Sequence, residues 1–342
     1  MFRDDLPFVS VCTPTFNRRP FFQAVIECFK HQDYPKDRIE WIIVDDGTDK
    51  IEDLVSDIPQ VKYFKYDKQM LIGKKRNITN DKASGDIIVN MDDDDYYCPT
   101  RISHAVRMLQ MNPEALCAGG SKQLIYFKHI NELYQVGPYS DNHGTAGTFA
   151  YRKELLNITK FDDSSALAEE KSFLKNFTIP FVQLDYRQTS IMFSHSQNTY
   201  DKKDMITNNS KKYVKPSKLV IEDVIDQKNL RDFYVNKIDD LLAEYKEGDP
   251  IMKPEVLKQQ KIMEEERNKA TQNMQNMQNM QNMQSSTPMF HYTSPDGNRV
   301  SYTPEQIIHM ITHKDKIIES QNQQIQKQNQ EINFLKTYYK IT

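Results

Sequence analysis

Four consecutive carboxylates, Asp92 to Asp95, follow the apolar run of residues 86–91 (DIIVNM). Adjacent carboxylates at the end of a strand repel one another, which costs stability unless a cation or hydrogen-bond donors neutralise them. Oxygen ligands select hard divalent ions such as Mg²⁺ or Mn²⁺, and proteins hold these ions with one or two carboxylates plus substrate phosphates and water. The run therefore predicts a divalent-metal site, and the competing interpretation is a solvated acidic turn.

Three more polar clusters stand where they could meet a nucleotide. Residues 45–48 (DDGT) end the apolar run 40–44, and a carboxylate there could accept hydrogen bonds from a base or ribose, or simply close the strand with a turn. Residues 13–18 (TPTFNR) end the first apolar run, where backbone N–H groups and Arg18 or Arg19 could face a diphosphate. Residues 73–77 (GKKRN) form a basic cluster that opens a helix.

Candidates for proton transfer and for a further metal ligand lie later in the chain. Glu169 and Glu170 precede an apolar helical stripe, so one of them could deprotonate an acceptor hydroxyl. Acidic residues in a first helical turn also occur because they complement the helix dipole. His195 is a candidate third metal ligand, although a lone histidine is more often structural, and His143 lies in a glycine-containing turn that could line an acceptor site.

The elements that must position these residues alternate along the first two hundred residues. Runs of strand type, at 8–13, 40–44, 61–66 and 86–91, are separated by helical patterns at 20–32, 73–84 and 99–111. This alternation predicts an α/β fold, with a mostly parallel sheet covered by helices on both faces. Ligands of such sheets bind outside the carboxyl ends of the strands, so the polar clusters are expected at one edge.

Composition limits the class of protein. A chain of 342 residues with 38% hydrophobic residues can form one core domain with extensions, and a net charge of −3 argues against nucleic acid as a partner. The four cysteines form no CxxC pair, which favours buried, reduced thiols. The sequence shows no signal peptide and no apolar stretch long enough for an integral membrane segment. We therefore expect a soluble, cytoplasmic protein (in the host cytoplasm or the virion, should the source be a virus).

The chain divides into four predicted segments. Residues 1–215 form the α/β domain, 216–265 a helical extension, 266–303 a low-complexity linker with a Gln-Asn-Met repeat, and 304–342 a C-terminal helix. Isoleucines recur every seven residues in this last segment, at Ile311, Ile318, Ile325 and Ile332. The heptad predicts a short coiled coil and a homo-oligomer built through it, with a single loose helix as the alternative.

Taken together, the motifs resemble a GT-A fold glycosyltransferase of family 2 over residues 7–200. The order and spacing of the motifs are more specific than any one of them, above all a strand with DDGT followed by a strand with DDDD. The segments that carry the resemblance are VSVCTPTFNR, EWIIVDDGT, GKKRN, ASGDIIVNMDDDDYYCPTRI, GTFAYRKELL and FDDSSALAEEKSFL.

The resemblance implies a role for each matching residue. For the nucleotide part of the donor these are Pro14, Asn17 and Arg18 in the first loop, Asp46 at the base, Arg76 on the nucleotide side, and Asp92 near the ribose, with Asp93 beside it. For the metal they are Asp94 as the direct ligand, with Asp92, and His195 is added from outside the matched motifs as the candidate third ligand. Glu170 matches the catalytic base, and because the acidic pair here is Glu169-Glu170, Glu169 stays a candidate.

The implied activity is the metal-dependent transfer of a sugar, with Mn²⁺ or Mg²⁺ as cofactor and inversion at the anomeric carbon. The donor would be a nucleoside-diphosphate sugar, with a UDP-sugar favoured, and the acceptor a hydroxyl of a glycan, protein or small molecule. A sugar-phosphate nucleotidyltransferase is one alternative, but its typical glycine-rich phosphate loop is missing from residues 13–19 (TPTFNRR). A non-catalytic carbohydrate- or nucleotide-binding module tethered by a coiled coil is another.

Overall fold

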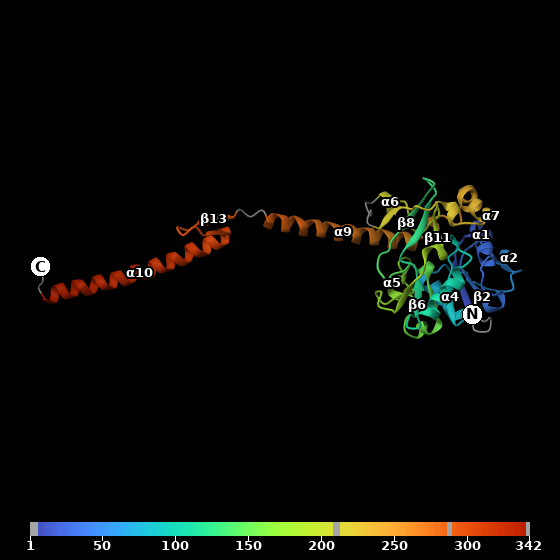
Figure 1. Ribbon diagram of the computed structural model, residues 1–342, viewed down its shortest axis with the longest axis horizontal. Coiled ribbons are helices and arrows are strands. Elements are labelled where there is room, and N and C mark those ends of the chain that lie inside the picture. The colour runs from blue at the N-terminus through green and yellow to red at the C-terminus, as the bar shows by residue number, and fades with distance from the viewer. Residues whose placement is uncertain (1–5, 208–212, 286–288, 340–342) are drawn as a thin grey trace. The chain divides into compact units, whose positions relative to one another are not determined.

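The computed structural model describes residues 6–207, 213–285 and 289–339. Two compact units, Met1–Met263 and Glu264–Thr342, make up the chain. The first unit holds both large sheets and is the part coloured blue to gold in Figure 1. Within the described residues, no helix is both long and apolar enough to cross a bilayer.

A seven-stranded, mainly parallel sheet forms the centre of the first unit, with the strand order β10-β6-β9-β4-β1-β2-β3. β9 is antiparallel to both of its neighbours, β4 and β6. The strands are β1 (Val9–Thr15), β2 (Ile39–Asp45), β3 (Val61–Lys65), β4 (Ile87–Asn90), β6 (Cys117–Gly119), β9 (Ala150–Arg152) and β10 (Phe181–Gln183). β1, β2 and β4 are buried along their whole length, which is why their sequences are near-continuous apolar runs.

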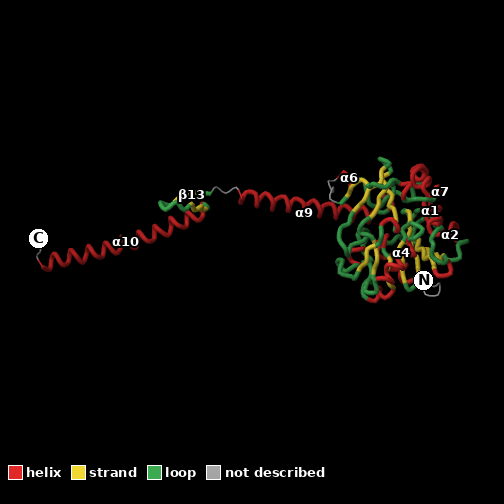
Figure 2. Tube along the Cα trace, in the orientation of Figure 1, coloured by secondary structure: helices red, strands yellow, loops and turns green. Residues whose placement is uncertain are grey.

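Helices cover both faces of this sheet, as the α/β prediction requires (Figure 2). On one face, side chains of β1 such as Val9 and Val11 share a core with α1 (Arg19–Lys30) and α4 (Arg101–Met111). On the other, Cys12 packs with residues of α5 (Glu170–Phe173), and α3 (Ile72–Lys82) contacts β1 and β2. The four cysteines are buried and unbridged, as expected.

A second, five-stranded sheet with the order β12-β8-β7-β11-β5 was not predicted from the sequence. Its strands are β5 (Tyr96–Tyr97), β7 (Gln123–Phe127), β8 (Glu132–Val136), β11 (Ser190–Ser194) and β12 (Val214–Pro216). The remaining helices of the unit are short: α2 (Glu52–Val55), α6 (Asp204–Thr207), α7 (Lys228–Asp232) and α8 (Ile238–Glu244), with a π-helical turn at Phe233–Lys237. Single 3₁₀ turns lie at Lys36–Arg38, Ala146–Thr148, Lys153–Asn157, Tyr186–Gln188, Ile221–Asp223 and Pro250–Met252.

The extension that follows the α/β domain is packed into the same unit. Tyr234 is fully buried, and its ring stacks on Phe193 of β11 at a centroid distance of 4.3 Å. Its hydroxyl donates to the carbonyl of Asp95 at 2.8 Å. Lys128 donates to the carbonyls of Tyr234 and Val235 at 2.9 and 2.7 Å, which fixes the π-helical turn. Through Tyr234, the extension therefore supports the backbone at the end of the acidic run.

The Gln-Asn-Met repeat lies in α9 (Pro254–Ser285), where the sequence led us to expect a linker without regular structure. The repeat contains neither proline nor glycine, and Gln and Met have good helix propensity, so nothing in it ends a helix. The second unit also contains a hairpin of β13 (Phe290–Thr293) and β14 (Arg299–Tyr302), followed by α10 (Pro304–Tyr339). The heptad isoleucines of α10 are about half exposed, and coiled-coil formation stays a prediction.

Replacing Tyr234 with Ala should destabilise the first unit by about 3–5 kcal/mol, because the change removes a buried ring and a buried hydrogen bond. Tyr234→Phe keeps the ring and should cost about 1 kcal/mol. Urea unfolding of the full chain measures both. A wild-type midpoint for Tyr234→Ala would show that the extension is not part of the folded unit.

Candidate active site at the junction of the two sheets

The acidic run connects the two large sheets. β4 ends at Asn90 in the seven-stranded sheet, and β5 begins at Tyr96 in the five-stranded sheet, so Asp92 to Asp95 form the crossing. β1 lies between β4 and β2 and is parallel to both. The polar clusters that follow these three strands therefore lie at the same edge of the sheet, as predicted for parallel strands.

Arg76 joins Asp92 to Glu169. Its Nη2 lies 3.0 Å from Asp92 Oδ1, and its Nε donates to Glu169 Oε1 at 2.8 Å. The Arg76 side chain is only 4% exposed, so this bridge is made in a largely dehydrated environment. The backbone N–H of Asp92 also donates to the Tyr97 hydroxyl at 2.6 Å. A Cβ at Gly147 would lie 2.6 Å from Asp92 Oδ2, so a larger residue there would displace the Asp92 carboxylate.

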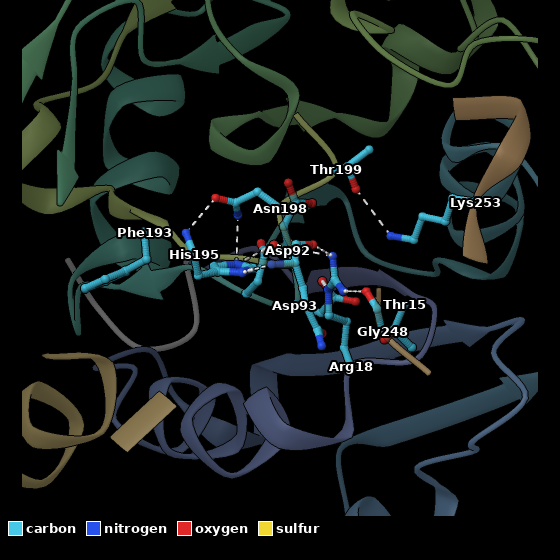
Figure 3. A network of polar contacts seen from close by, with 12 residues as sticks. Thr15, Arg18, Asp92, Asp93, Phe193, His195, Asn198, Thr199, Gly248 and Lys253 are labelled. Carbon is cyan, nitrogen blue, oxygen red and sulfur yellow. Dashed lines mark hydrogen bonds and ion pairs between the residues drawn. The ribbon is translucent and has the colours of Figure 1, made fainter. Parts of the chain in front are cut away.

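Arg18 faces the next two carboxylates (Figure 3). Its Nε is 3.8 Å from Asp93 Oδ1, and its Nη2 is 4.0 Å from Asp94 Oδ2. The same guanidinium donates to the carbonyls of Gln197 and Gly248 at 2.7 and 3.1 Å. Arg18 is 2% exposed, so it links three segments of the chain while balancing the acidic run.

His195 lies beside Asp94, with 3.3 Å between Nε2 and Oδ2. Burial lowers the pKa of His195 to about 4, against the opposing effect of Asp94, so the ring is neutral at pH 7. The backbone N–H of Gln197 donates to Nδ1 at 3.2 Å, while Nε2 lies 2.7 Å from Asn198 Nδ2 and 3.3 Å from Asp94 Oδ2.

The charges of the run are only partly balanced. Burial, and next the neighbouring acids, raise the pKa of Asp95, while burial opposed by Arg18 raises the pKa of Asp93 to about 6. The pKa of Asp92 is likewise raised by burial, against the effect of Arg76. Burial also opposes ionisation of Asp94, but the His195 hydrogen bond and Arg18 hold its pKa below the usual range. The cluster thus favours an added positive charge.

Within the described residues, no three His, Cys, Asp or Glu side chains are arranged to hold a metal ion. The donor set nevertheless fits a hard divalent cation. It consists of closely spaced carboxylates whose pKa values are raised at three of four positions, and the buried Asp95 Oδ1 has no hydrogen-bond partner in the described part of the chain. Mg²⁺ and Mn²⁺ prefer oxygen ligands, and these carboxylates are only partly balanced by positive charge.

Glu169 and Glu170 are adjacent but differ in environment. Glu169 is buried and paired with Arg76. Glu170 begins α5, is only partly buried, and has a pKa raised to about 7 by burial and then by Glu169. A carboxylate with a pKa near neutrality is suited to accept a proton.

The other predicted nucleotide-side residues lie at the same edge of the sheet. Several of their polar atoms already form hydrogen bonds within the protein. Pro14 is in β1, and Asn17, at φ +50°, donates to the carbonyl of Glu247 at 2.8 Å. Asp46 accepts from Lys75 Nζ at 2.9 Å and from the Met70 N–H at 2.5 Å. These contacts place Asp46 in the loop network around the site, and its contact with a base stays a prediction.

Three residues of the site were not predicted individually from the sequence. Lys75 is paired with Asp46, Tyr97 fixes the backbone of Asp92, and Lys253 comes from outside the region with recognised motifs. The basic cluster 73–77 gave a signal for Lys75, and Tyr97 closely follows the acidic run. Nothing in the sequence around Lys253 marks it, because only folding brings it to this edge.

The family model described as "Glycosyl transferase family 2" matches residues 10–164, which contain the first loop, Asp46, Arg76 and the acidic run. The chain carries a glycosyl transferase family 2 domain. The family assignment agrees with the mixed α/β fold, in which the polar clusters share the carboxyl edge of the main sheet.

Two curated relatives show how far the similarity extends. The GalNAc(5)-diNAcBac-PP-undecaprenol beta-1,3-glucosyltransferase of Campylobacter jejuni is 36% identical over 97 residues, 26% of this chain and 30% of the relative. The glucosyl-dolichyl phosphate glucuronosyltransferase of Haloferax volcanii is 30% identical over 117 residues, 33% of this chain and 37% of the relative. The matched part of the chain therefore spans less than half the length of either relative.

Similar solved structures include S. aureus TarS 1-349, with 20% identity and a TM-score of 0.42, over 54% of this chain and 60% of that one. Another is the mannosyltransferase PcManGT from Pyrobaculum calidifontis in complex with GDP-Man and Mn²⁺, with 17% identity and a TM-score of 0.45, over 55% of this chain and 57% of that one.

Replacing Arg76 with Met should destabilise the family 2 domain by about 3–5 kcal/mol, because the buried carboxylate of Glu169 and the partly buried one of Asp92 would lose their shared counter-charge. Arg19→Met is a matched control: Arg19 also pairs with two carboxylates, Asp49 and Asp53, but is 33% exposed, so its loss should cost about 1 kcal/mol or less. Equal losses in denaturant unfolding would contradict the buried bridge.

Proposed function

We propose that this chain is a glycosyltransferase that moves a sugar from a nucleoside-diphosphate sugar to an acceptor hydroxyl. The observation that carries the proposal is the partly buried acidic run of the family 2 domain, at the same sheet edge as the family's nucleotide loops. Both curated relatives are named for the transfer of a sugar unit. We take a UDP-sugar as the donor to test first, and a glycan, a protein or a small molecule as the acceptor.

Asp94 and Asp92 would hold the metal ion, Mn²⁺ or Mg²⁺, with His195 as the third proposed ligand. Support comes from the carboxylate donor set and from the imidazole that faces Asp94 at 3.3 Å. When bound, such an ion neutralises charge on the donor diphosphate. Asp93 lies beside these ligands and is assigned to the nucleotide side.

The nucleotide would lie along the edge formed by the loops after β1 and β2. Pro14, Asn17 and Arg18 supply the first loop, and Asp46 the base side. Arg76 would orient Asp92 toward the ribose through the contact at 3.0 Å. Holding donor and acceptor in one orientation supplies much of the rate enhancement expected of such a site.

Glu170 is the proposed base. As the acceptor oxygen attacks the anomeric carbon, its proton passes to Glu170 and the nucleoside diphosphate departs from the opposite side, which inverts the configuration. Glu169 is the less suitable of the pair, because its carboxylate is committed to Arg76 at 2.8 Å. Its position next to Glu170 instead helps raise the pKa of the base to about 7.

The C-terminal helix enters the proposal as an oligomerisation element. Ile311, Ile318, Ile325 and Ile332 keep heptad spacing along α10 and are about half exposed in the single chain. A second copy of the helix could cover this seam and form a homo-oligomer.

Asp94→Ala should abolish the metal-dependent rise in melting temperature that UDP gives, and should lower turnover at least about a hundredfold. The loss follows from removing the proposed direct ligand. Thermal-shift assays with UDP, GDP and UDP-sugars, with and without Mn²⁺, measure the first effect, and UDP release measures the second. Asp57→Ala, at an exposed acid, is the control. Unchanged turnover in Asp94→Ala would exclude Asp94 as the ligand.

Glu170→Gln should lower turnover by about 10²–10⁴-fold while UDP still binds, because the amide cannot accept the proton. In the wild type, kcat/KM should be highest above pH 7 and fall about tenfold per pH unit below it, since the base must be ionised. The pH profile of UDP release tests both statements. A profile flat from pH 5 to 8 would argue against Glu170 as the base.

A further inference from the structure

Residues 245–253, here called the strap, join α8 to α9 and lie outside the part of the chain matched to the family. The strap is bonded to the first nucleotide loop. Asn17 donates to the carbonyl of Glu247 at 2.8 Å, and Arg18 donates to that of Gly248 at 3.1 Å. At the start of the strap, the Tyr245 hydroxyl donates to Asp49 at 2.8 Å. The strap is thus attached to the loops that follow β1 and β2.

Gly248 fixes how closely the strap approaches. A Cβ at this position would lie 2.9 Å from the backbone oxygen of Asn17 and 2.1 Å from Oε1 of Gln197. The backbone oxygen cannot move aside as a flexible side chain can, so a larger residue would push the strap outward. The position of Lys253, at the end of the strap, depends on this contact.

Lys253 extends from the strap toward the region of Arg18 and Asp93 (Figure 3). Its Nζ donates to Thr199 Oγ1 at 3.2 Å and lies 5.6 Å from the centroid of the Phe16 ring. Lys75 Nζ lies 5.7 Å from the same ring. Two ammonium groups therefore meet one aromatic ring in the first nucleotide loop.

The cations of this edge differ in how far they are already neutralised. Lys75 is paired with Asp46 at 2.9 Å, and the guanidinium of Arg18 is bound to two carbonyls and 2% exposed. Lys253 is partly exposed and, among the described residues, makes no ion pair within 4.0 Å. Burial, and next Arg18 and Lys75, lower the pKa of Lys253 to about 7, against the smaller opposing effects of Asp93 and Asp94.

We propose that Lys253 binds the diphosphate of the sugar nucleotide, as a donor-binding residue supplied by the strap. This inference rests on the proposed function. An anion between Lys253 and the acidic run with its metal would give Lys253 a close counter-charge, since Asp93 and Asp94 act on it only from beyond ion-pair distance. Lysine binds phosphate as a point charge, and its long side chain can follow the group as it leaves. Arg18, already bonded to the strap, would position it and with it Lys253.

The test compares four full-length proteins: wild type, Lys253→Met, Lys253→Arg and Lys258→Met. Methionine keeps the length of the side chain without the charge, and arginine keeps the charge. Lys258 is exposed on α9, which follows directly after Lys253, and serves as the matched control. Titration calorimetry with Mn²⁺ measures the Kd of UDP and GDP, and the same titration with uridine or guanosine measures binding without phosphate. Melting temperatures verify that each variant is folded.

We expect Lys253→Met to raise the Kd of the better-bound nucleoside diphosphate about tenfold and to leave the Kd of its nucleoside unchanged. Lys253→Arg should stay within about threefold of the wild type, and Lys258→Met should match it. Wild-type diphosphate affinity in Lys253→Met, or an equal loss for nucleoside and diphosphate, would overturn the assignment of Lys253 alone. A wild type that binds neither UDP nor GDP would overturn the proposed function, and this inference with it.

Discussion

The structure of the site depends on holding four adjacent carboxylates, one of them buried and three partly buried, where the chain crosses from one sheet to the other. Such a crossing is stable only if cations reach it, and here they come from distant parts of the chain. Arg76 arrives on α3 and also reaches Glu169, while Arg18 arrives from the end of β1. Because each arginine bonds a second segment as well, neutralising the run also fixes the loops around it.

The strands at the centre of the sheet could be predicted because their burial leaves a visible pattern in the sequence of each strand. β1, β2 and β4 are buried on both faces, so each is an apolar run ended by polar residues, and the order of these runs places the polar clusters at one edge. The second sheet gave no comparable signal. β5 has only two residues and forms through pairing with β11, almost a hundred residues later in the chain.

The same distinction separates what could be predicted of the site from what could not. The residue types of the acidic run and of Glu169-Glu170 indicate their chemistry directly, but their partners depend on tertiary contacts. Arg76 and Glu169 are 93 residues apart, and Asn17 and Glu247 are 230 residues apart. No periodicity or spacing in the sequence records such pairs. The Gln-Asn-Met repeat is helical in α9, because low complexity argues against a buried core but not against a helix.

The two adjacent glutamates show how one bridge can create two chemical environments. Arg76 takes the carboxylate of Glu169 as a partner, so that carboxylate stays near Asp92 as a fixed negative charge. Glu170 is outside the bridge and has that charge as its neighbour, which, together with burial, raises its pKa to about 7. A base held in this way gains its affinity for a proton from the same contact that orders the acidic run. In the proposed mechanism, Arg76 would therefore couple the nucleotide side to proton transfer without itself taking part in the chemistry.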